Sequence, residues 1–361
     1  MSISDLFPAP RYLRFPVFGF DLSDRSLKYL ELLRTRRGRR LGRFGEARIP
    51  PGLIEDGQIL KKEELISLLK DFQKERGIKY IAAALPEEKV FLRTVKLPAM
   101  EDREIKVALE SQLEENVPLS VSEAVFDYEV IPEIDKNGHL DVSLAAVPKN
   151  FAESYVEVFQ KVGFEPVLFD LESRALVRSL VPTGDNSCQM IINFGATATN
   201  FVIAVGGRAR FTSVIKVAGR MLDQAIAKAF SLNLPEAEKI KKEKSRLGGT
   251  AENDELFASL LPVVSAVADE VGRHISYWES HQDEHGSPRS KIEKVILAGG
   301  DANLKGLVDY FSRRTGLPVE YGNVWVNVFS LNDELPEISF KDSLRYAVAS
   351  GLALFEVNQI Y

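Results

Sequence analysis

The amino-acid sequence predicts an α/β protein with two lobes and a smaller subdomain inserted into the first lobe. Two observations support this prediction. Apolar, strand-like segments alternate with amphipathic helices along most of the chain. A strand–turn–strand pattern also occurs twice, 172 positions apart, which indicates an internal duplication. A length of 361 residues is enough for about two domains.

The first lobe is predicted from four successive segments. Residues 17–33 read as an apolar strand, a polar turn and an alternating strand, and 40–50 as a further strand. Apolar residues at helical spacing predict a helix over 61–77, which stops at Gly77. A buried strand, "KYIAAALP", follows at 79–86.

The next block, 86–162, has a different order of predicted strands and helices and is predicted to be an inserted subdomain. Its pattern is strand, helix, strand, strand, helix, and the segments lie at 89–98, 101–116, 124–131, 139–148 and 150–163.

The remainder of the chain predicts the second lobe and the segments that connect it to the first. The expected elements are a strand at 166–170, a helix at 172–181, three strands across 188–217, helices from 219 to about 282, a strand at 294–298 with a helix after it, and a final helix at 342–357. That last helix is rich in alanine and glycine, which suits close helix packing.

Composition excludes several classes of protein. The net charge of −6, without a long basic stripe, argues against nucleic acid as a partner. The single cysteine, Cys188, excludes an internal disulfide framework and fits a reducing compartment. No signal peptide and no run of about 18 apolar residues is present, so we expect a soluble cytoplasmic protein. The basic cluster 34–40 reads as a solvated hairpin tip or as a patch that faces lipid or a partner.

The duplicated hairpins predict a phosphate site. With Asp21 placed over Asn193, each copy has an apolar strand, a polar Gly/Ser/Thr-rich turn and an alternating strand. Backbone N–H groups and hydroxyls of two such turns can hold polyphosphate oxygens from both sides. The Asp21 carboxylate suits Mg²⁺ bound through water, and Lys28 either adds charge near the phosphates or faces solvent. A single hairpin would read more simply as a turn.

Two further motifs fit a nucleotide. Gly299 and Gly300 stand where a strand turns into a helix, so a ligand can approach the backbone there. Glu238 and Lys241 share one face of a predicted helix and can reach a ribose and a base together, although such a pair is more often a surface ion pair.

The order of these motifs resembles the actin/hexokinase/heat-shock chaperone superfamily, which has a ribonuclease H-like fold. Within it the chain resembles the PilM family of type IV pilus machines, a relative of the division protein FtsA. The most specific segment is "ALESQLEENVPLSVSEAVFDYEVI" (108–131), and "DLESRALVRSL" (170–180) and "YAVASGLAL" (346–354) also match. The resemblance implies an actin-like two-lobed fold with the inserted subdomain in the FtsA position.

The resemblance also implies domain limits. They are an N-terminal extension at 1–16, a first lobe (1A) at 17–85, 163–186 and 341–361, an inserted 1C-type subdomain at 86–162, a second lobe (2A) at 187–230 and 290–340, and a helical 2B-type subdomain at 231–289.

Carried over position by position, the resemblance implies ATP and Mg²⁺ as cofactors. The first phosphate loop would comprise Asp21, Ser23, Asp24, Arg25, Ser26 and Lys28, and the second Asn193, Gly195, Ala196, Thr197 and Thr199. Gly219 would lie close to the phosphates, and Glu238 and Lys241 would bind the sugar and the base. The adenosine pocket would be lined by Gly299, Gly300 and Asn303.

Two departures from the family pattern affect the expected activity. Ser23 and Asp24 replace the usual Gly and Ser, which places a negative charge near the phosphates unless Mg²⁺ or Arg25 neutralises it. Asn193 replaces the usual Asp of the second loop, and an amide brings no charge to a metal and cannot act as a base. We therefore expect nucleotide binding with weak or absent hydrolysis, at most a weak ATPase.

The partner that the resemblance implies is the N-terminal cytoplasmic peptide of a PilN-like inner-membrane protein. The peptide would dock between the first lobe and the inserted subdomain, in a groove that includes Leu109 and Leu113. It would hold the chain at the inner face of the membrane. Pilus motor or platform proteins and self-association are further expected contacts.

Two alternatives remain open at the level of sequence. One is an active actin-like ATPase of cell division or secretion, similar to FtsA, and the other is a sugar-kinase-like enzyme on the same fold. The sequence leaves undecided whether the protein forms filaments and which pilus, competence or secretion machine it serves.

Overall fold

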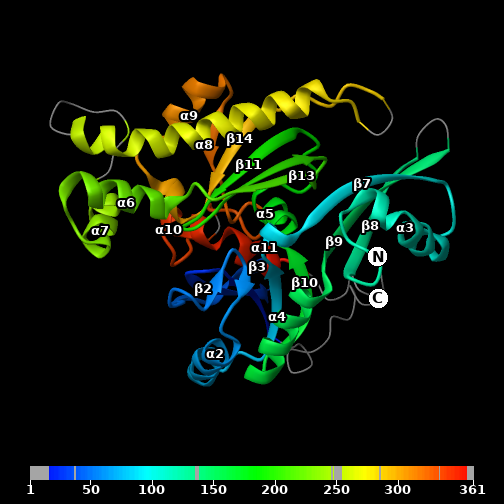
Figure 1. The fold of residues 1–361 in the computed structure, drawn as a ribbon, viewed down its shortest axis with the longest axis horizontal. Coiled ribbons are helices and arrows are strands. Elements are labelled where there is room, and N and C mark those ends of the chain that lie inside the picture. The colour runs from blue at the N-terminus through cyan, green and yellow to red at the C-terminus, as the bar shows by residue number, and fades with distance from the viewer. Residues whose placement is uncertain are drawn as a thin grey trace.

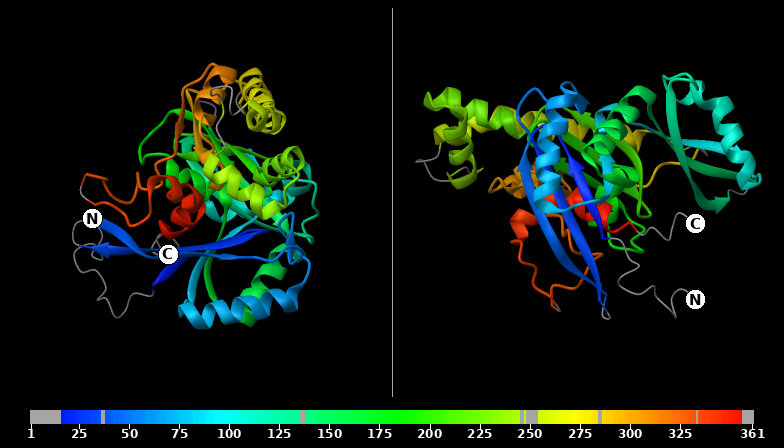
Figure 2. Two further views of the ribbon diagram at one scale, coloured as in Figure 1. Left: turned by 90° about the vertical axis from the view of Figure 1, so that its left-hand side faces the viewer. Right: turned by 90° about the horizontal axis from the view of Figure 1, so that it is seen from below.

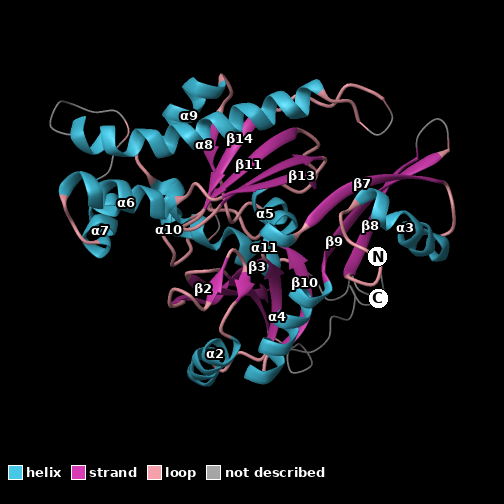
Figure 3. Cartoon of the chain, viewed as in Figure 1, coloured by secondary structure: helices cyan, strands magenta, loops and turns pink. Residues whose placement is uncertain are grey.

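The computed structural model describes residues 16–35, 38–134, 138–244, 247, 254–283, 286–332 and 334–355. They form two five-stranded sheets, one above the other in the view of Figure 1, with a three-stranded sheet to one side. Helices cover the outer faces of the two large sheets and also lie between them (Figure 3). The predicted two-lobed α/β fold with an inserted subdomain is confirmed.

The sheet of the first lobe has the order β10-β6-β1-β2-β3. β1 is antiparallel to β2 and parallel to β6, so the hairpin and the crossover share one central strand. The strands are β1 Val17–Leu22, β2 Ser26–Thr35, β3 Gly38–Arg48, β6 Tyr80–Leu85 and β10 Glu165–Leu171.

The sheet of the second lobe has the order β13-β12-β11-β14-β15, which repeats the first sheet strand for strand. The register repeats as well, because Asp21 pairs with Lys28 in the first hairpin and Asn193 with Asn200 in the second. The predicted duplication is therefore confirmed. The strands are β11 Cys188–Phe194, β12 Thr199–Val205, β13 Arg208–Ile215, β14 Lys294–Ala298 and β15 Val319–Tyr321.

Two short helices lie between the sheets, as the left view of Figure 2 shows for the second of them. α5 (Glu172–Leu180) and α11 (Ala347–Ala353) pack on one another, and α11 also packs on β1. The contact requires Gly351, because a Cβ there would lie 1.8 Å from the backbone oxygen of Ala175. The small residues predicted to allow close helix packing therefore meet a neighbouring helix.

Longer helices cover the outer faces. α2 (Lys62–Arg76) and α4 (Lys149–Val162) pack together against the first sheet. On the second lobe, α8 packs against both α6 and α9 (Figure 1). These helices are α6 Gly219–Phe230, α7 Leu234–Lys244, α8 Asp254–Ser280 and α9 Leu307–Thr315.

The inserted subdomain has its own small core but is shorter than expected. It contains β7 (Phe91–Pro98), α3 (Asp102–Asn116), β8 (Ala124–Ile134) and β9 (His139–Pro148). α4, predicted as its last helix, instead buries its apolar face in the core of the first lobe. The amphipathic pattern of a helix does not specify which sheet it packs on. Because α4 packs in the first lobe, the C-terminal limit of the inserted subdomain lies at 148 and not at 162.

Leu109 and Leu113 require a second correction. Both side chains are completely buried in the core of the insert, where they pack with Val95, Val142 and their neighbours. They hold α3 on its sheet and do not face a groove.

The C-terminal segment is broken where one continuous helix was expected. It comprises α10 (Phe340–Ser343), a 3₁₀ turn over Leu344–Tyr346 and α11. Within that turn the Leu344 carbonyl accepts a hydrogen bond from the Gly299 N–H at 3.0 Å. The remaining short elements are β4 Ile54–Glu55, β5 Gln58–Ile59, and 3₁₀ turns at Glu87–Lys89 and Gly300–Asn303.

Some expectations lie wholly or partly outside the described residues. They include the N-terminal extension, of which only residue 16 is described, and the tip of the basic hairpin at 36–37. Within the described part of the chain, no helix combines the length and apolar character needed to cross a bilayer.

Candidate functional site

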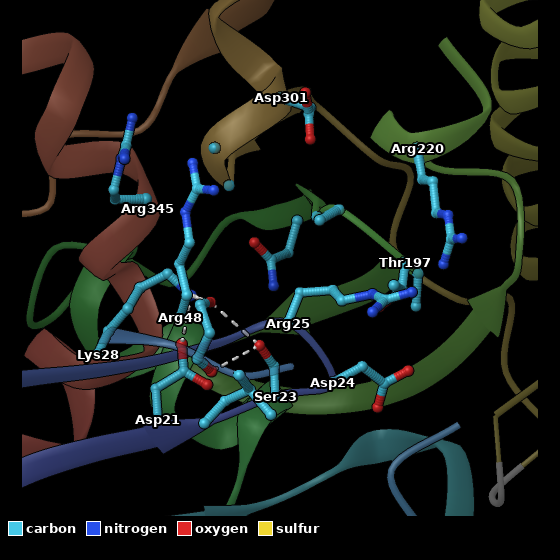
Figure 4. Close-up of a pocket in the computed structure, with 18 of the residues that line it drawn as sticks. Asp21, Ser23, Asp24, Arg25, Lys28, Arg48, Thr197, Arg220, Asp301 and Arg345 are labelled. Carbon is cyan, nitrogen blue, oxygen red and sulfur yellow. Dashed lines mark hydrogen bonds and ion pairs between the residues drawn. The ribbon is translucent and has the colours of Figure 1, made fainter. Parts of the chain in front are cut away.

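A cavity of about 670 Å³ lies between the lobes, where the two duplicated hairpins face one another (Figure 4). It brings together most of the residues that the sequence singled out. From that set it is lined by Asp21, Ser23, Asp24, Arg25, Ser26, Lys28, Asn193, Gly195, Ala196, Thr197, Glu238, Lys241, Gly299 and Gly300.

The turn between β1 and β2 is held by hydrogen bonds within itself. The Ser23 N–H and hydroxyl both donate to the Ser26 carbonyl, at 2.9 and 3.0 Å. The Lys28 amine donates to the Ser26 hydroxyl at 2.7 Å and lies 3.5 Å from the Asp21 carboxylate. The turn therefore places a carboxylate, an amine and two hydroxyls along one wall of the cavity.

Asp24 has a different role from the one its position suggests. Its carboxylate accepts hydrogen bonds from the backbone N–H groups of Asp56 and Gly57, both at 3.1 Å. Figure 4 shows this side chain pointing away from Asp21 and Ser23. Burial raises the pKa of Asp24, although the two N–H groups oppose that rise. The extra charge in the first loop is thus directed at the β4–β5 turn and away from the other loop residues.

The second loop is fixed by the first turn of α6. The N–H groups of Gly219 and Arg220 donate to the carbonyls of Gly195 and Ala196, at 3.0 and 2.8 Å. Thr199 is buried, and its hydroxyl donates to the Val217 carbonyl at 2.7 Å. Thr199 therefore stabilises the loop through a buried hydrogen bond and does not line the cavity.

Gly299 lies against the second loop in a conformation that favours glycine. Its φ is +93°, and a Cβ would lie 2.3 Å from the Phe194 carbonyl oxygen. Gly299 therefore brings the end of β14 directly against the loop after β11, whereas the motif had been interpreted as room for a ligand.

Lys241 is committed to an internal ion cluster. Its amine lies 2.6 Å from the Asp301 carboxylate and 3.0 Å from that of Asp223, and it donates to the Gly219 carbonyl at 3.1 Å. Burial alone would lower the pKa of this amine, but the two carboxylates outweigh burial and raise it. Lys241 joins α7 to α6, so it does not present a free amine to a sugar or base.

Two other expected ligand residues have packing roles. A Cβ on Gly219 would lie 1.9 Å from the Asp301 carboxylate, so this glycine makes room for the ion cluster. The Asn303 amide donates to the Lys341 carbonyl at 2.7 Å and ties the 3₁₀ turn to α10. Neither residue lines the cavity.

Three arginines of the cavity were missed by the sequence analysis. Arg345 is paired with Glu46 at 3.0 Å and with Asp342 at 3.3 Å. Arg48 and Arg220, like the expected Arg25, form no hydrogen bond or ion pair through their side chains among the described residues. Arg48 pairs across the strands with Ser26, and Arg220 follows Gly219, so both are next to residues that the motifs had identified.

Buried carboxylates lie beneath the first loop. Glu172, at the start of α5, accepts a hydrogen bond from the Asn200 amide at 2.5 Å. Burial, together with the charges of Glu88 and Asp21, raises the pKa of Glu172 well above its ordinary value. Burial and the charges of Asp24 and Glu87 raise the pKa of Glu88 to about 7. The floor of the cavity thus favours protonated carboxyl groups.

A metal centre requires a particular grouping of side chains. Across the described ranges, no three His, Cys, Asp or Glu side chains are grouped so that they could hold a metal ion. Asp21, at the end of β1 and at the cavity wall, fits a magnesium ion that takes most of its oxygens from water and a phosphate ligand.

The comparisons with known proteins agree with this architecture. Residues 19–357 match the family described as type IV pilus assembly protein PilM. The structure of a PilM–PilN type IV pilus biogenesis complex is similar, with a TM-score of 0.78 and 23% identity over 94% of this chain and 98% of that one.

Two actin-like structures are more distant. The ethanolamine utilization protein EutJ from Carboxydothermus hydrogenoformans has a TM-score of 0.57 and 17% identity, over 97% of this chain and 92% of its own. MreB5 of Spiroplasma citri bound to ADP has a TM-score of 0.57 and 16% identity, over 95% of this chain and 97% of its own. The fold is therefore actin-like, and the chain belongs to the PilM family of type IV pilus assembly proteins.

Proposed function

We propose that this chain is a nucleotide-binding scaffold of the type IV pilus inner-membrane assembly platform, with ATP and Mg²⁺ as its ligands. The observation that carries the proposal is the charge of the inter-lobe cavity. Arg25, Arg48 and Arg220 line it next to two loops rich in hydroxyl and N–H groups, and among the described residues their side chains form no ion pair. Such a surface is suited to a polyphosphate, which arginine binds through charge-assisted hydrogen bonds.

The other end of the cavity suits a nucleoside. Leu234 and Pro235, at the start of α7, offer apolar surface for a base, and Gly300, which has no side chain, also lines the cavity. Glu238 lies on the same helix and can accept hydrogen bonds from ribose hydroxyls. Because Lys241 is held by Asp223 and Asp301, the sugar contact is assigned to Glu238 alone.

Hydrolysis is proposed to be weak or absent. Asn193 stands where the family pattern has an aspartate, and its amide can accept a hydrogen bond but cannot take a proton from water. Bound magnesium would neutralise phosphate charge beside Asp21. The chain would therefore keep ATP bound for a long time and hydrolyse it slowly or not at all.

The proposed partner is the N-terminal cytoplasmic peptide of a PilN-like inner-membrane protein. The similar complex contains PilM and PilN, and this chain covers 98% of that PilM-like chain. We place the peptide at the junction of the first lobe and the insert, without Leu109 and Leu113, which are buried. Such a partner would keep the protein peripheral to the cytoplasmic face of the membrane. Contacts with motor or other platform proteins, and self-association, belong to the same proposal.

Calorimetric titration of ATP, with and without Mg²⁺, tests the nucleotide proposal directly. The wild type should bind ATP more tightly with Mg²⁺, and Arg48→Ala should weaken binding about 10-fold or more, because one charge-assisted contact is lost. Asn193→Asp should raise the slow ATPase rate. Absence of binding by the wild type in both conditions would reject the proposal and favour a pure protein-interaction module.

A further inference from the structure

Two arginines of the cavity come from opposite lobes, and their side chains lie near one another. Arg25 lies in the turn between β1 and β2, whereas Arg220 is the second residue of α6. Figure 4 shows their guanidinium groups approaching one another beside Thr197 of the second phosphate loop. Two like charges, one from each side of the cleft, thus line this part of the cavity.

Among the described residues, nearby carboxylates offset the charge of this pair only in part. Asp24 precedes Arg25 in the chain, and both of its carboxylate oxygens accept hydrogen bonds from backbone N–H groups of the β4–β5 turn. Asp56 is paired with Lys216. Burial lowers the pKa of Arg25, and the positive charge of Arg220 lowers it further. The negative charges of Asp24 and Glu55 oppose this decrease without cancelling it.

We propose that Arg25 and Arg220 form the binding site for the terminal phosphoryl group of a nucleoside triphosphate, so that the protein binds ATP in preference to ADP. The inference rests on the proposed nucleotide function and adds its specificity. A terminal phosphoryl group carries about two negative charges and three acceptor oxygens, enough to accept from a guanidinium of each lobe at once. The same contact would join the lobes across the cleft.

Arg48 serves as the internal comparison. It ends β3 and points into the middle of the cavity in Figure 4, away from the Arg25–Arg220 pair. We assign it to the inner phosphates, which ATP and ADP share. Loss of Arg48 should therefore weaken both nucleotides by similar factors, whereas loss of Arg25 or Arg220 should weaken mainly ATP.

The test is the ratio of ADP to ATP dissociation constants, measured with Mg²⁺ by calorimetry on the full-length protein. The wild type should prefer ATP by about 10-fold or more. Arg25→Ala and Arg220→Ala should each weaken ATP by about 10-fold or more and ADP by less than about 3-fold. Arg48→Ala should leave the ratio unchanged, and exposed Arg313→Ala on α9 should change neither constant. Thermal midpoints would establish that each variant is folded.

The outcomes separate the two proposals. A wild type that binds neither nucleotide overturns both of them. A wild type that binds ADP and ATP equally, or arginine variants that weaken both nucleotides by one common factor, overturns the terminal-phosphate assignment and leaves the nucleotide function intact. If the double variant Arg25→Ala/Arg220→Ala binds ATP only as tightly as ADP, the assignment is supported.

Discussion

Lys241 illustrates what a residue pattern can and cannot specify. The sequence places Glu238 and Lys241 on one face of a helix, which is correct, and the helix does line the cavity. The pattern does not specify which of two consecutive lysines is buried. In the structure Lys242 pairs with Glu238, while Lys241 turns inward onto Asp223 and Asp301. Those two carboxylates are distant in sequence, so no local spacing indicates them.

The first prediction compares the two neighbouring lysines. Lys241→Met leaves two carboxylates without their cation and should lower the free energy of unfolding by about 3–5 kcal/mol. Lys242→Met breaks an ion pair whose lysine side chain is 56% exposed, and it should cost less than about 1 kcal/mol. Urea titration measures both. Equal losses would show that the buried cluster has no special importance for the fold.

A second residue-scale prediction concerns Glu88 and pH. Burial, with Asp24 and Glu87 nearby, raises the pKa of Glu88 from 4.5 to about 7. Between these two values the folded protein holds a proton that the unfolded chain has released. Stability from this group is therefore complete below pH 4.5 and is lost as the pH rises through about 7.

Glu88→Gln removes this dependence, because the amide is neutral throughout. The variant should gain stability over the wild type as the pH rises from 5 to 8, by on the order of 3 kcal/mol. Glu157→Gln is the control of opposite sign, since Lys62 and Lys161 lower the pKa of Glu157 to about 2 and its effect is already constant above pH 5. An unchanging difference for Glu88→Gln across that range would contradict the assignment.

At the scale of elements, the packing of α11 gives a third prediction. A Cβ on Gly351 would overlap the backbone oxygen of Ala175 on α5. Gly351→Ala should therefore destabilise the protein by about 1–3 kcal/mol or more, because backbone atoms cannot move aside easily. Gly272→Ala is the matched control. Gly272 lies within α8 with nothing within 4 Å of its added Cβ, so alanine should stabilise by about 0.5–1 kcal/mol. The thermal midpoint should move in opposite directions.

The elements that local pattern predicted well are the two hairpins. Each needs only alternation of apolar residues and a polar turn, and the second copy confirms the first. The failures concern long-range partners. α4 is as amphipathic as expected, but only the folded chain shows that its partner is α2. The 3₁₀ turn before α11 is bonded through Leu344 to Gly299, and these two residues are 45 positions apart.

At the scale of the molecule, the two lobes are similar in topology, and polar contacts outside α5 and α11 also join them, such as Asn303 with Lys341. One contact is the ion pair between Lys216, just after β13, and Asp56 in the β4–β5 turn, at 2.5 Å. The same turn is held by Asp24 of the first phosphate loop. A second contact, Arg208 with Glu129 at 3.1 Å, joins β13 to the insert. Opening of the cleft would therefore separate Lys216 from Asp56.

Our last prediction is that the Lys216–Asp56 pair biases the free protein toward the closed cleft. Lys216→Gln and Asp56→Asn should each increase the fraction of open molecules, and asparagine tolerates the φ of +51° at position 56. The double variant should open no further than either single one, because both remove one interaction. Lys79→Gln breaks a comparably exposed pair with Glu165 inside the first lobe and should leave the opening unchanged.

Single-molecule energy transfer between dyes on the two lobes can measure this opening. Cysteines introduced at exposed Lys70 on α2 and Arg313 on α9 would carry the dyes. The native Cys188 should not react, because it is buried and burial raises the pKa of its thiol to about 12. Longer interdye distances in both single variants, without a further increase in the double one, are expected. Additive shifts would mean that the two side chains act separately, and unchanged distances would mean that other contacts between the lobes hold the cleft closed.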